Sequence, residues 1–273
     1  MRIAVTGASG NVGGQVVSLL TAAGGDEVVG LSRRGPVPAD YDDPASLRAA
    51  LTGIDTLVLV TSDGEAARVL THHAHLVSAV EQTGVGHVVA LSGLDTDLAS
   101  PFCYAYTNGV LEAQLSRTGC AVSVVRASLF AEFFAGFLDA ARATGELRLP
   151  ASDARVSLVS RADVARCLAV LARAEPTGRA HEVTGPAALS MHDVAAVAGR
   201  AWDTPVSYAD VDEPTFVAQT ARSGESPWWT YAYASMFASI RERRWDAVSA
   251  EVRTLTGRDP VPFDAACEFR ATR

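Results

Sequence analysis

The chain has 273 residues, 48% of them hydrophobic and 20% charged, which suits one α/β domain with a sizeable core or a core domain with a smaller appendage. Its formal net charge of −8 argues against a nucleic acid or an anionic membrane as a partner. All 23 basic residues are arginine, which excludes mechanisms that need a Schiff-base lysine or a lysine that lowers the pKa of a catalytic tyrosine.

The first half of the chain alternates short, β-branched apolar runs with helical patterns. Apolar runs without strict alternation are typical of parallel strands that are covered on both faces. We expect strands at 3–5, 28–31, 57–60, 88–91 and 122–125, separated by helices at 11–23, 44–52, 64–83 and 105–117. This order predicts an α/β fold with a Rossmann-type, doubly wound parallel sheet.

After residue 127 strand patterns become rare and helices predominate, with serine-led helix starts near residues 161 and 191. We expect residues 1–127 to form the bulk of the sheet domain and residues 128–273 to form a smaller, mostly helical region that builds a cleft with it. Domains of this kind often receive the chain more than once, so later segments can rejoin the sheet.

No sequence feature indicates export or insertion into a membrane. The amino terminus has no basic segment followed by an apolar run and a cleavage site, and no apolar stretch of about 18 residues lacks polar side chains. We therefore expect a cytoplasmic protein without a membrane partner. Its four cysteines are too widely spaced to form a metal-type pair, and we expect them to be reduced.

The strongest motif lies between the first strand and the first helix and has the spacing G-x-x-G-x-x-G. Gly7 permits the tight turn, Gly10 lets the backbone approach a diphosphate, and Gly13 allows close packing of helix on strand. The helix start then offers free N–H groups to phosphates. We predict a dinucleotide site that includes Ser9, Asn11 and Val12; the alternative is a glycine-rich turn that binds nothing.

An arginine follows the second strand, where an NAD enzyme places a carboxylate for the ribose hydroxyls. Because a guanidinium pairs with a 2′-phosphate, Arg33 favours NADP(H) over NAD(H), unless it is a solvated surface residue. Asp40 lies near the end of an expected third strand, where a carboxylate can accept a hydrogen bond from the adenine, although it suits a loop equally well. Thr61, Ser62 and Ser92 end later strands and should face the ribose and the nicotinamide.

Several segments together resemble one family. The runs TGASGNVG, DPASLRAAL, GVGHVVALSG, YTNGVLEAQLSRTG, RASLFAEFF and SRADVA resemble the NmrA-like branch of the atypical short-chain dehydrogenase/reductases, especially proteins like triphenylmethane reductase and NADPH:quinone oxidoreductase. The resemblance implies an NADP(H)-binding Rossmann domain and a substrate cleft shaped by the C-terminal region. It also implies that the backbone of Ser128, Leu129 and Phe130 borders the nicotinamide.

The catalytic pattern of typical short-chain dehydrogenases is incomplete. Their tyrosine protonates a carbonyl oxygen, assisted by a lysine four residues later and by a serine. Here Tyr104 is followed by Asn108, where relatives often carry histidine or lysine, and Ser92 stands at the serine position. Tyr104 and Ser92 are the candidate catalytic pair, with Tyr106 an equally plausible hydroxyl; both tyrosines could instead hold their hydroxyls in solvent.

Two aromatic groups could line a pocket for a flat apolar substrate. The first group has the i, i+3, i+4, i+7 spacing of one helix face, and both groups suit either a pocket or a core. The first group is Phe130, Phe133, Phe134 and Phe137, and the second is Trp228, Trp229, Tyr231, Tyr233 and Phe237. Trp228 and Trp229 are adjacent and point about 100° apart on a helix, so at least one should reach the cleft, a lid or a subunit contact, which leaves a homodimer open.

The sequence also contains a histidine tract. His72 and His75 share a helix face with His73 between them, but no carboxylate or cysteine completes a metal set. We therefore expect a solvated helix face and no metal.

Three functions fit these observations. Because the lysine is missing, we favour an NADPH-dependent reductase of a quinone, enone or related conjugated aromatic small molecule, in which the cofactor supplies the hydride and solvent supplies the proton. The alternatives are an NADP(H)-sensing regulator without turnover and a carbonyl reductase that uses Ser92 and Tyr104.

Overall fold

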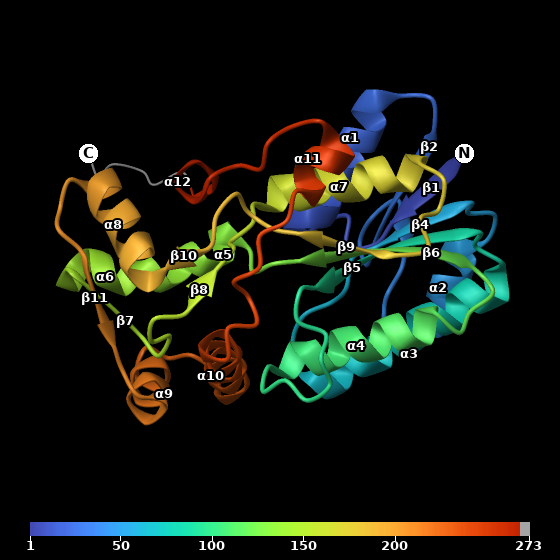
Figure 1. Ribbon diagram of the computed structural model, residues 1–273. Helices are drawn as coiled ribbons and strands as arrows, with labels where there is room; N and C mark the ends of the chain where they lie inside the picture. The colour runs from blue at the N-terminus through green and yellow to red at the C-terminus, as the bar shows by residue number, and fades with distance from the viewer. Residues whose placement is uncertain (268–273) are drawn as a thin grey trace.

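The computed structural model describes residues 1–267 and is built on one seven-stranded parallel sheet. The strand order is β3-β2-β1-β4-β5-β6-β9, so the chain reverses its direction of winding between β1 and β4 (Figure 1). The strands of this sheet are β1 (Arg2–Val5), β2 (Glu27–Ser32), β3 (Val37–Pro38), β4 (Thr56–Leu59), β5 (His87–Gly93), β6 (Ala121–Ala127) and β9 (Ala180–Val183).

Helices cover both faces of the sheet (Figure 1). One face carries α1, α7 and α11, and the other carries α2, α3 and α4. These helices are α1 (Asn11–Ala23), α2 (Pro44–Leu51), α3 (Ala66–Thr83), α4 (Cys103–Leu115), α7 (Arg161–Arg173) and α11 (Glu251–Thr256). The predicted doubly wound sheet is therefore confirmed.

The five predicted strands are confirmed, and β3 lies where a third strand ending near Asp40 is expected, but the sequence patterns missed β9. β3 has only two residues, and β9 alternates buried and more exposed side chains, unlike the buried runs that marked the others. Since β9 pairs with β6 and α7 packs on α1, the sheet domain receives the chain again after residue 127.

The remaining elements form a second lobe at the left of Figure 1. It has its own apolar core, built around buried side chains such as Phe134, Phe237 and Trp245. A parallel pair joins β7 to β11, and an antiparallel pair joins β8 to β10. The elements are α5 (Ala131–Phe134), η1 (Ala135–Leu138), α6 (Asp139–Thr144), β7 (Glu146–Leu149), β8 (Arg155–Val156), β10 (Leu189–Ser190), α8 (Met191–Trp202), β11 (Ser207–Asp210), α9 (Glu213–Arg222), α10 (Pro227–Arg241) and α12 (Phe263–Ala266).

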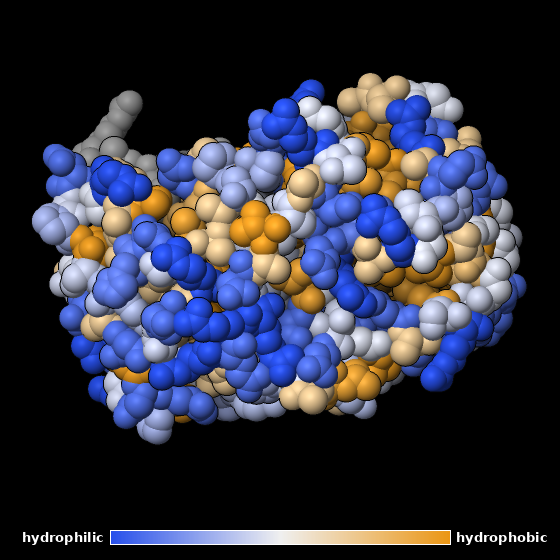
Figure 2. Space-filling view, in the orientation of Figure 1, coloured by the Kyte–Doolittle hydropathy of each residue, from blue (hydrophilic) through white to orange (hydrophobic). Residues whose placement is uncertain are grey.

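The outer surface is mixed. In Figure 2 hydrophilic residues dominate the lower left, where α9 and α10 lie, and hydrophobic residues appear mostly in small groups. Within residues 1–267, no helix combines the length and the apolar character needed to cross a membrane.

Candidate active site

A cavity of about 750 Å³ opens at the carboxyl ends of β1, β4, β5 and β6, between the sheet and the second lobe. Ligands of open α/β sheets bind at this edge, next to the point where the strand order reverses. Most residues that the sequence singled out line it, and their roles stay predictions: Gly7, Ser9, Gly10, Asn11, Val12, Gly13, Arg33, Asp40, Thr61, Ser62, Ser92, Tyr104, Ser128, Leu129, Phe130, Phe133 and Trp229.

The glycine turn has the form that a diphosphate requires. Gly7 adopts a positive φ of 61°, which a side chain would disfavour. A Cβ atom on Gly13 would stand 2.3 Å from the Gly7 carbonyl oxygen, so only glycine lets α1 begin this close to the turn. No side chain caps the start of α1 and no acidic residue lies in its first turn, so its N–H groups face the cavity without a competing anion. These residues fit a dinucleotide phosphate.

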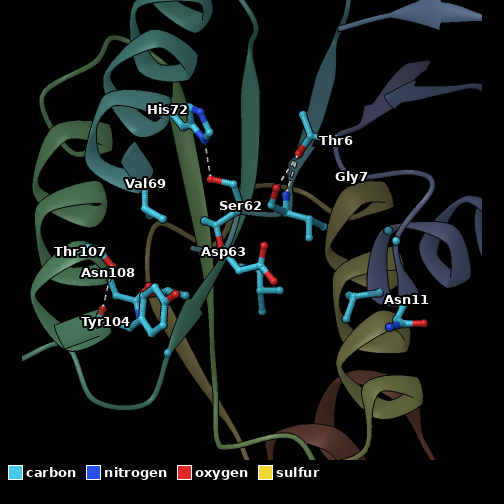
Figure 3. Close-up of a pocket in the computed structure, with 18 of the residues that line it drawn as sticks. Thr6, Gly7, Asn11, Ser62, Asp63, Val69, His72, Tyr104, Thr107 and Asn108 are labelled. Carbon is cyan, nitrogen blue, oxygen red and sulfur yellow. Dashed lines mark hydrogen bonds between the residues drawn. The ribbon is translucent and has the colours of Figure 1, made fainter. Parts of the chain in front are cut away.

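Thr6, which the motif analysis did not single out, fixes the point where β1 and β4 separate. Its hydroxyl donates to the Val60 carbonyl at 3.0 Å and accepts from the Val60 N–H at 2.8 Å (Figure 3). Since both residues line the cavity, these two hydrogen bonds hold the glycine turn and the end of β4 together at the cavity surface.

The far end of the cavity, near β2 and β3, combines one arginine with an acidic loop. Arg33 is exposed and lines the cavity together with Asp40 and Tyr41. Asp40 accepts a hydrogen bond from the Asp42 N–H at 3.0 Å, so it shapes its own loop as well as facing the cavity. The Tyr41 hydroxyl donates to the Val60 carbonyl at 2.7 Å, and burial raises the pKa of Tyr41 to about 12.

The histidine tract does not form a solvated face, and that prediction is wrong. His72 and His73 are buried because α3 packs between α2 and α4, and His75 is half-buried. His72 bridges two groups: its Nδ1 lies 2.7 Å from the Ser62 hydroxyl, and its Nε2 lies 2.9 Å from an Asp42 carboxylate oxygen (Figure 3). Ser62 is thereby tied to a charged surface group.

Charge and burial around these histidines shift two pKa values. Hydrogen bonds from Arg68 and then His72 lower the pKa of Asp42 to about 2. Burial, with a smaller contribution from His72, lowers the pKa of His73 to about 4. In residues 1–267 no cluster of three histidine, cysteine or acidic side chains could hold a metal ion.

Ser92 lies at the end of β5, as expected, but its hydroxyl is engaged below the cavity. It donates to Glu112 Oε1 at 2.6 Å, and Arg126 binds the same carboxylate through Nη2 at 2.6 Å and Nε at 3.1 Å. No local pattern marked Glu112 and Arg126, because they lie on different elements, α4 and β6, and meet Ser92 only when α4 packs on the sheet. The Ser92 oxygen can therefore accept a hydrogen bond from a ligand in the cavity, but its O–H is already used and cannot donate one.

Tyr104 is likewise engaged. Its hydroxyl donates to the Gly64 carbonyl at 2.7 Å and accepts from the Gly64 N–H at 3.0 Å, so it does not stand in solvent. Burial raises its pKa to about 12. Tyr106, the alternative hydroxyl, is 47% exposed and does not line the cavity.

One wall of the cavity is aromatic. Trp229 and Tyr233 stack with their ring centres 5.7 Å apart at an angle of 28°, and Phe133 lies 5.9 Å from Tyr233. Arg161 lies on the same side, with its guanidinium 5.6 Å from the Phe130 ring. Tyr233 belongs to the second predicted aromatic group and lines the cavity, whereas the sequence patterns missed Arg161.

Two predicted pocket residues lie elsewhere. Phe134 is fully buried in the core of the second lobe, with its ring centre 5.6 Å from that of Phe137 and 6.2 Å from that of Phe237, so it belongs to the core and not to the cavity. Trp228 does not line the cavity; it packs against Tyr231 and the edge of Tyr104. The adjacent indoles diverge as expected, and only Trp229 of the two lines the cavity.

The chain is similar to several known proteins. A family described as NAD(P)H-binding matches residues 7–175. The chain is 31% identical over 222 residues to the NAD(P)H azoreductase of Xenophilus azovorans, covering 77% of each chain. It is 27% identical to quinone oxidoreductase 2 of Escherichia coli, covering 79% of this chain and 80% of that one. Triphenylmethane reductase from Citrobacter, solved with NADP(H), shares the fold with a TM-score of 0.89 at 20% identity, covering 98% and 99%.

Proposed function

Since this chain belongs to the NAD(P)H-binding family, in the NmrA-like branch of the atypical short-chain dehydrogenase/reductases, we propose that it reduces a quinone or a related conjugated aromatic compound with NADPH. Membership rests on a match to more than half of the chain and confirms the resemblance in the sequence. The substrate class is our proposal. The observation that carries it is that the glycine turn, a cavity-facing arginine and an aromatic wall share one cavity.

The residues around the cavity suit NADP(H). The backbone from Gly7 to Gly13 would hold the diphosphate, and Arg33 would bind the 2′-phosphate of the adenosine. Thr61 and Ser62 would lie beside the ribose, and Ser128 to Phe130 would border the nicotinamide. When bound, NADPH supplies a hydride, which is two electrons and one hydrogen nucleus.

The protein's own contribution is to bind and orient the acceptor. Phe133, Trp229 and Tyr233 would stack on a flat ring and exclude water from one side of it. A quinone that gains a hydride and one proton from water becomes a hydroquinone, and NADP⁺ is left, so no lysine or acidic side chain is needed.

The positions of the two hydroxyls favour this reaction over ordinary carbonyl reduction. Both Ser92 and Tyr104 donate their O–H to partners inside the protein. A carbonyl reductase that relied on them would first have to break these bonds. The names of the azoreductase and the quinone oxidoreductase among the relatives agree with conjugated acceptors.

The test is to follow NADPH consumption at the nicotinamide absorbance band with 1,4-naphthoquinone, an azo dye and the cationic triphenylmethane dye crystal violet. We expect oxidation above the blank with at least one of them. If calorimetry shows tight NADPH binding but none of these acceptors consumes NADPH, the proposal fails and an NADP(H)-sensing regulator is favoured, as the missing lysine of the Tyr-x-x-x-Lys pattern would allow.

A further inference from the structure

We propose that the side-chain amide of Asn108 holds the carbonyl oxygen of the acceptor and thereby selects carbonyl acceptors over cationic dyes. The inference rests on the proposed function, because it assigns a recognition role within that cavity. It also replaces the two hydroxyls, Ser92 and Tyr104, as the candidate contact to substrate oxygen.

The first argument is position. Asn108 lies on α4, four residues after Tyr104 and four before Glu112, so all three share the helix face that meets the sheet. Its amide stands directly over the end of β5: a Cβ atom on Gly93 would be 2.5 Å from Asn108 Nδ2. Gly93, at the last position of β5, thus makes room for this amide. Asn108 lies beside Tyr104 in the cavity (Figure 3).

The second argument is a count of hydrogen-bond donors. β5 and α4 bring four polar side chains to the cavity, and three of them already donate within the protein. Ser92 donates to Glu112, Tyr104 to the Gly64 carbonyl, and Thr107 to the Tyr104 carbonyl at 3.0 Å. Over the part of the chain that the structure describes, the Asn108 amide makes no hydrogen bond, although it is half-buried. A polar group in this position needs a partner from water or a ligand.

The third argument is chemical. The carbonyl is expected near β5 and β6, because the phosphate turn and Arg33 occupy the other end of the cavity. As a hydride reaches the acceptor ring, two electrons move onto the carbonyl oxygen, and a fixed N–H donor stabilises that charge. An amide cannot give up its proton at neutral pH, so the proton that completes the product comes from water.

This assignment predicts a charge-dependent selectivity. A quinone develops negative charge on oxygen, whereas a cationic triphenylmethane dye has no carbonyl and loses its positive charge when a hydride arrives. Asn108→Leu removes the donor at nearly constant volume. Asn108→Asp places a negative charge there, which opposes the reduction of the quinone but not the reduction of the cationic dye.

The experiment compares both variants with the native protein on 1,4-naphthoquinone and crystal violet. We expect kcat/KM for the quinone to fall about 10²-fold in Asn108→Leu and further in Asn108→Asp, the usual cost of one such donor. For the dye, Asn108→Leu should change kcat/KM less than about threefold and Asn108→Asp should not lower it. Equal losses of kcat/KM for both acceptors, or no loss for the quinone, would overturn the assignment. Tyr233→Phe tests the other hydroxyl on the cavity wall. If that variant, and not Asn108→Leu, loses kcat/KM for the quinone alone, the assignment to Asn108 is also overturned.

Measuring the affinity for the quinone tests the role of Asn108 even if the protein does not turn the quinone over. Quenching of tryptophan fluorescence reports the affinity of naphthoquinone for the NADP⁺-loaded protein, and Asn108→Leu should weaken it roughly 3- to 10-fold, the value of one hydrogen bond. Unchanged affinity would overturn the role of Asn108. If the native protein oxidises NADPH with none of the acceptors yet Asn108→Leu weakens quinone binding, the reductase proposal fails while the contact stands.

Discussion

The phenol of Tyr104 is bonded to both backbone groups of Gly64, donating to its carbonyl at 2.7 Å and accepting from its N–H at 3.0 Å. This pair joins α4 to the loop between β4 and α3, at a glycine whose φ is 111°. The loop contributes Thr61, Ser62 and Asp63 to the cavity. The tyrosine that the sequence offers as a proton donor therefore holds this loop in place.

Tyr104→Phe should cost stability more than catalysis. Losing the bonds to Gly64 should lower the free energy of unfolding by about 1–2 kcal/mol, while kcat falls less than about tenfold. Urea unfolding and NADPH consumption with naphthoquinone measure the two effects. Tyr106→Phe, on the exposed side of the same helix, is the control. A fall in kcat of roughly 10²–10⁴ would instead identify Tyr104 as a general acid.

Arg33 should decide which dinucleotide binds. Arg33→Ala should weaken NADPH binding roughly 10- to 100-fold, because a charge-assisted contact to the 2′-phosphate is lost, and should leave NADH binding nearly unchanged. Calorimetry with both cofactors measures this. Arg34→Ala is the matched control, since Arg34 is exposed but does not line the cavity. Parallel losses for NADPH and NADH would remove Arg33 from 2′-phosphate recognition.

Gly13→Ala should abolish tight cofactor binding. The added methyl would stand 2.3 Å from the Gly7 carbonyl oxygen and 2.8 Å from that of Thr6, so the turn and α1 must separate. We expect NADPH affinity to fall at least about tenfold by calorimetry. Gly119→Ala, where no atom lies within 4 Å, should bind as the native protein does. Native affinity in Gly13→Ala would contradict the role given to this turn.

Trp229 should contribute to acceptor binding and Trp228 should contribute less. Trp229→Leu removes the ring that stacks on Tyr233 beside the cavity, and we expect KM for naphthoquinone to rise about 3- to 10-fold. Trp228→Leu changes an indole that does not line the cavity. The same KM increase in both variants would point to a general loosening of α10.

His73 should make stability depend on pH. Its pKa of about 4 in the folded protein lies below its ordinary value of 6.5, so the unfolded chain binds protons more readily between these values. The stabilisation is complete above about pH 6.5 and is lost as pH falls toward 4, on the order of 3 kcal/mol in total. In His73→Asn, the free energy of unfolding should change less with pH between about pH 4 and 6.5 than it does in the native protein. Because carboxylates titrate in both proteins, an unchanged slope would exclude His73 as the cause.

Much of the fold was readable from local patterns. The buried apolar runs identified β1, β2, β4, β5 and β6 because each of these strands lies inside a parallel sheet. Helix starts followed from their caps, as at Asp43, whose side chain accepts from the Ala45 N–H. The short strand β3 and the half-exposed β9 carried no such pattern, since their pairing depends on neighbours and not on their own residues.

The sequence by itself predicted the end of the cavity that we assign to the cofactor. A glycine turn between strand and helix, and an arginine after the second strand, are local features whose geometry follows from backbone sterics and chain order. The order of the strands then brought these residues to one edge of the sheet.

Only the tertiary structure decided which polar groups are free at the end of the cavity that we assign to the acceptor. Whether Ser92 and Tyr104 have a free O–H depends on Glu112 and Gly64, which approach them only through the packing of α4 and the loop before α3. The same packing buried His72 and His73, which on an isolated helix would face water. Hydrogen-bond partners and burial are set by contacts between distant segments, and so residue type and spacing alone could not assign them.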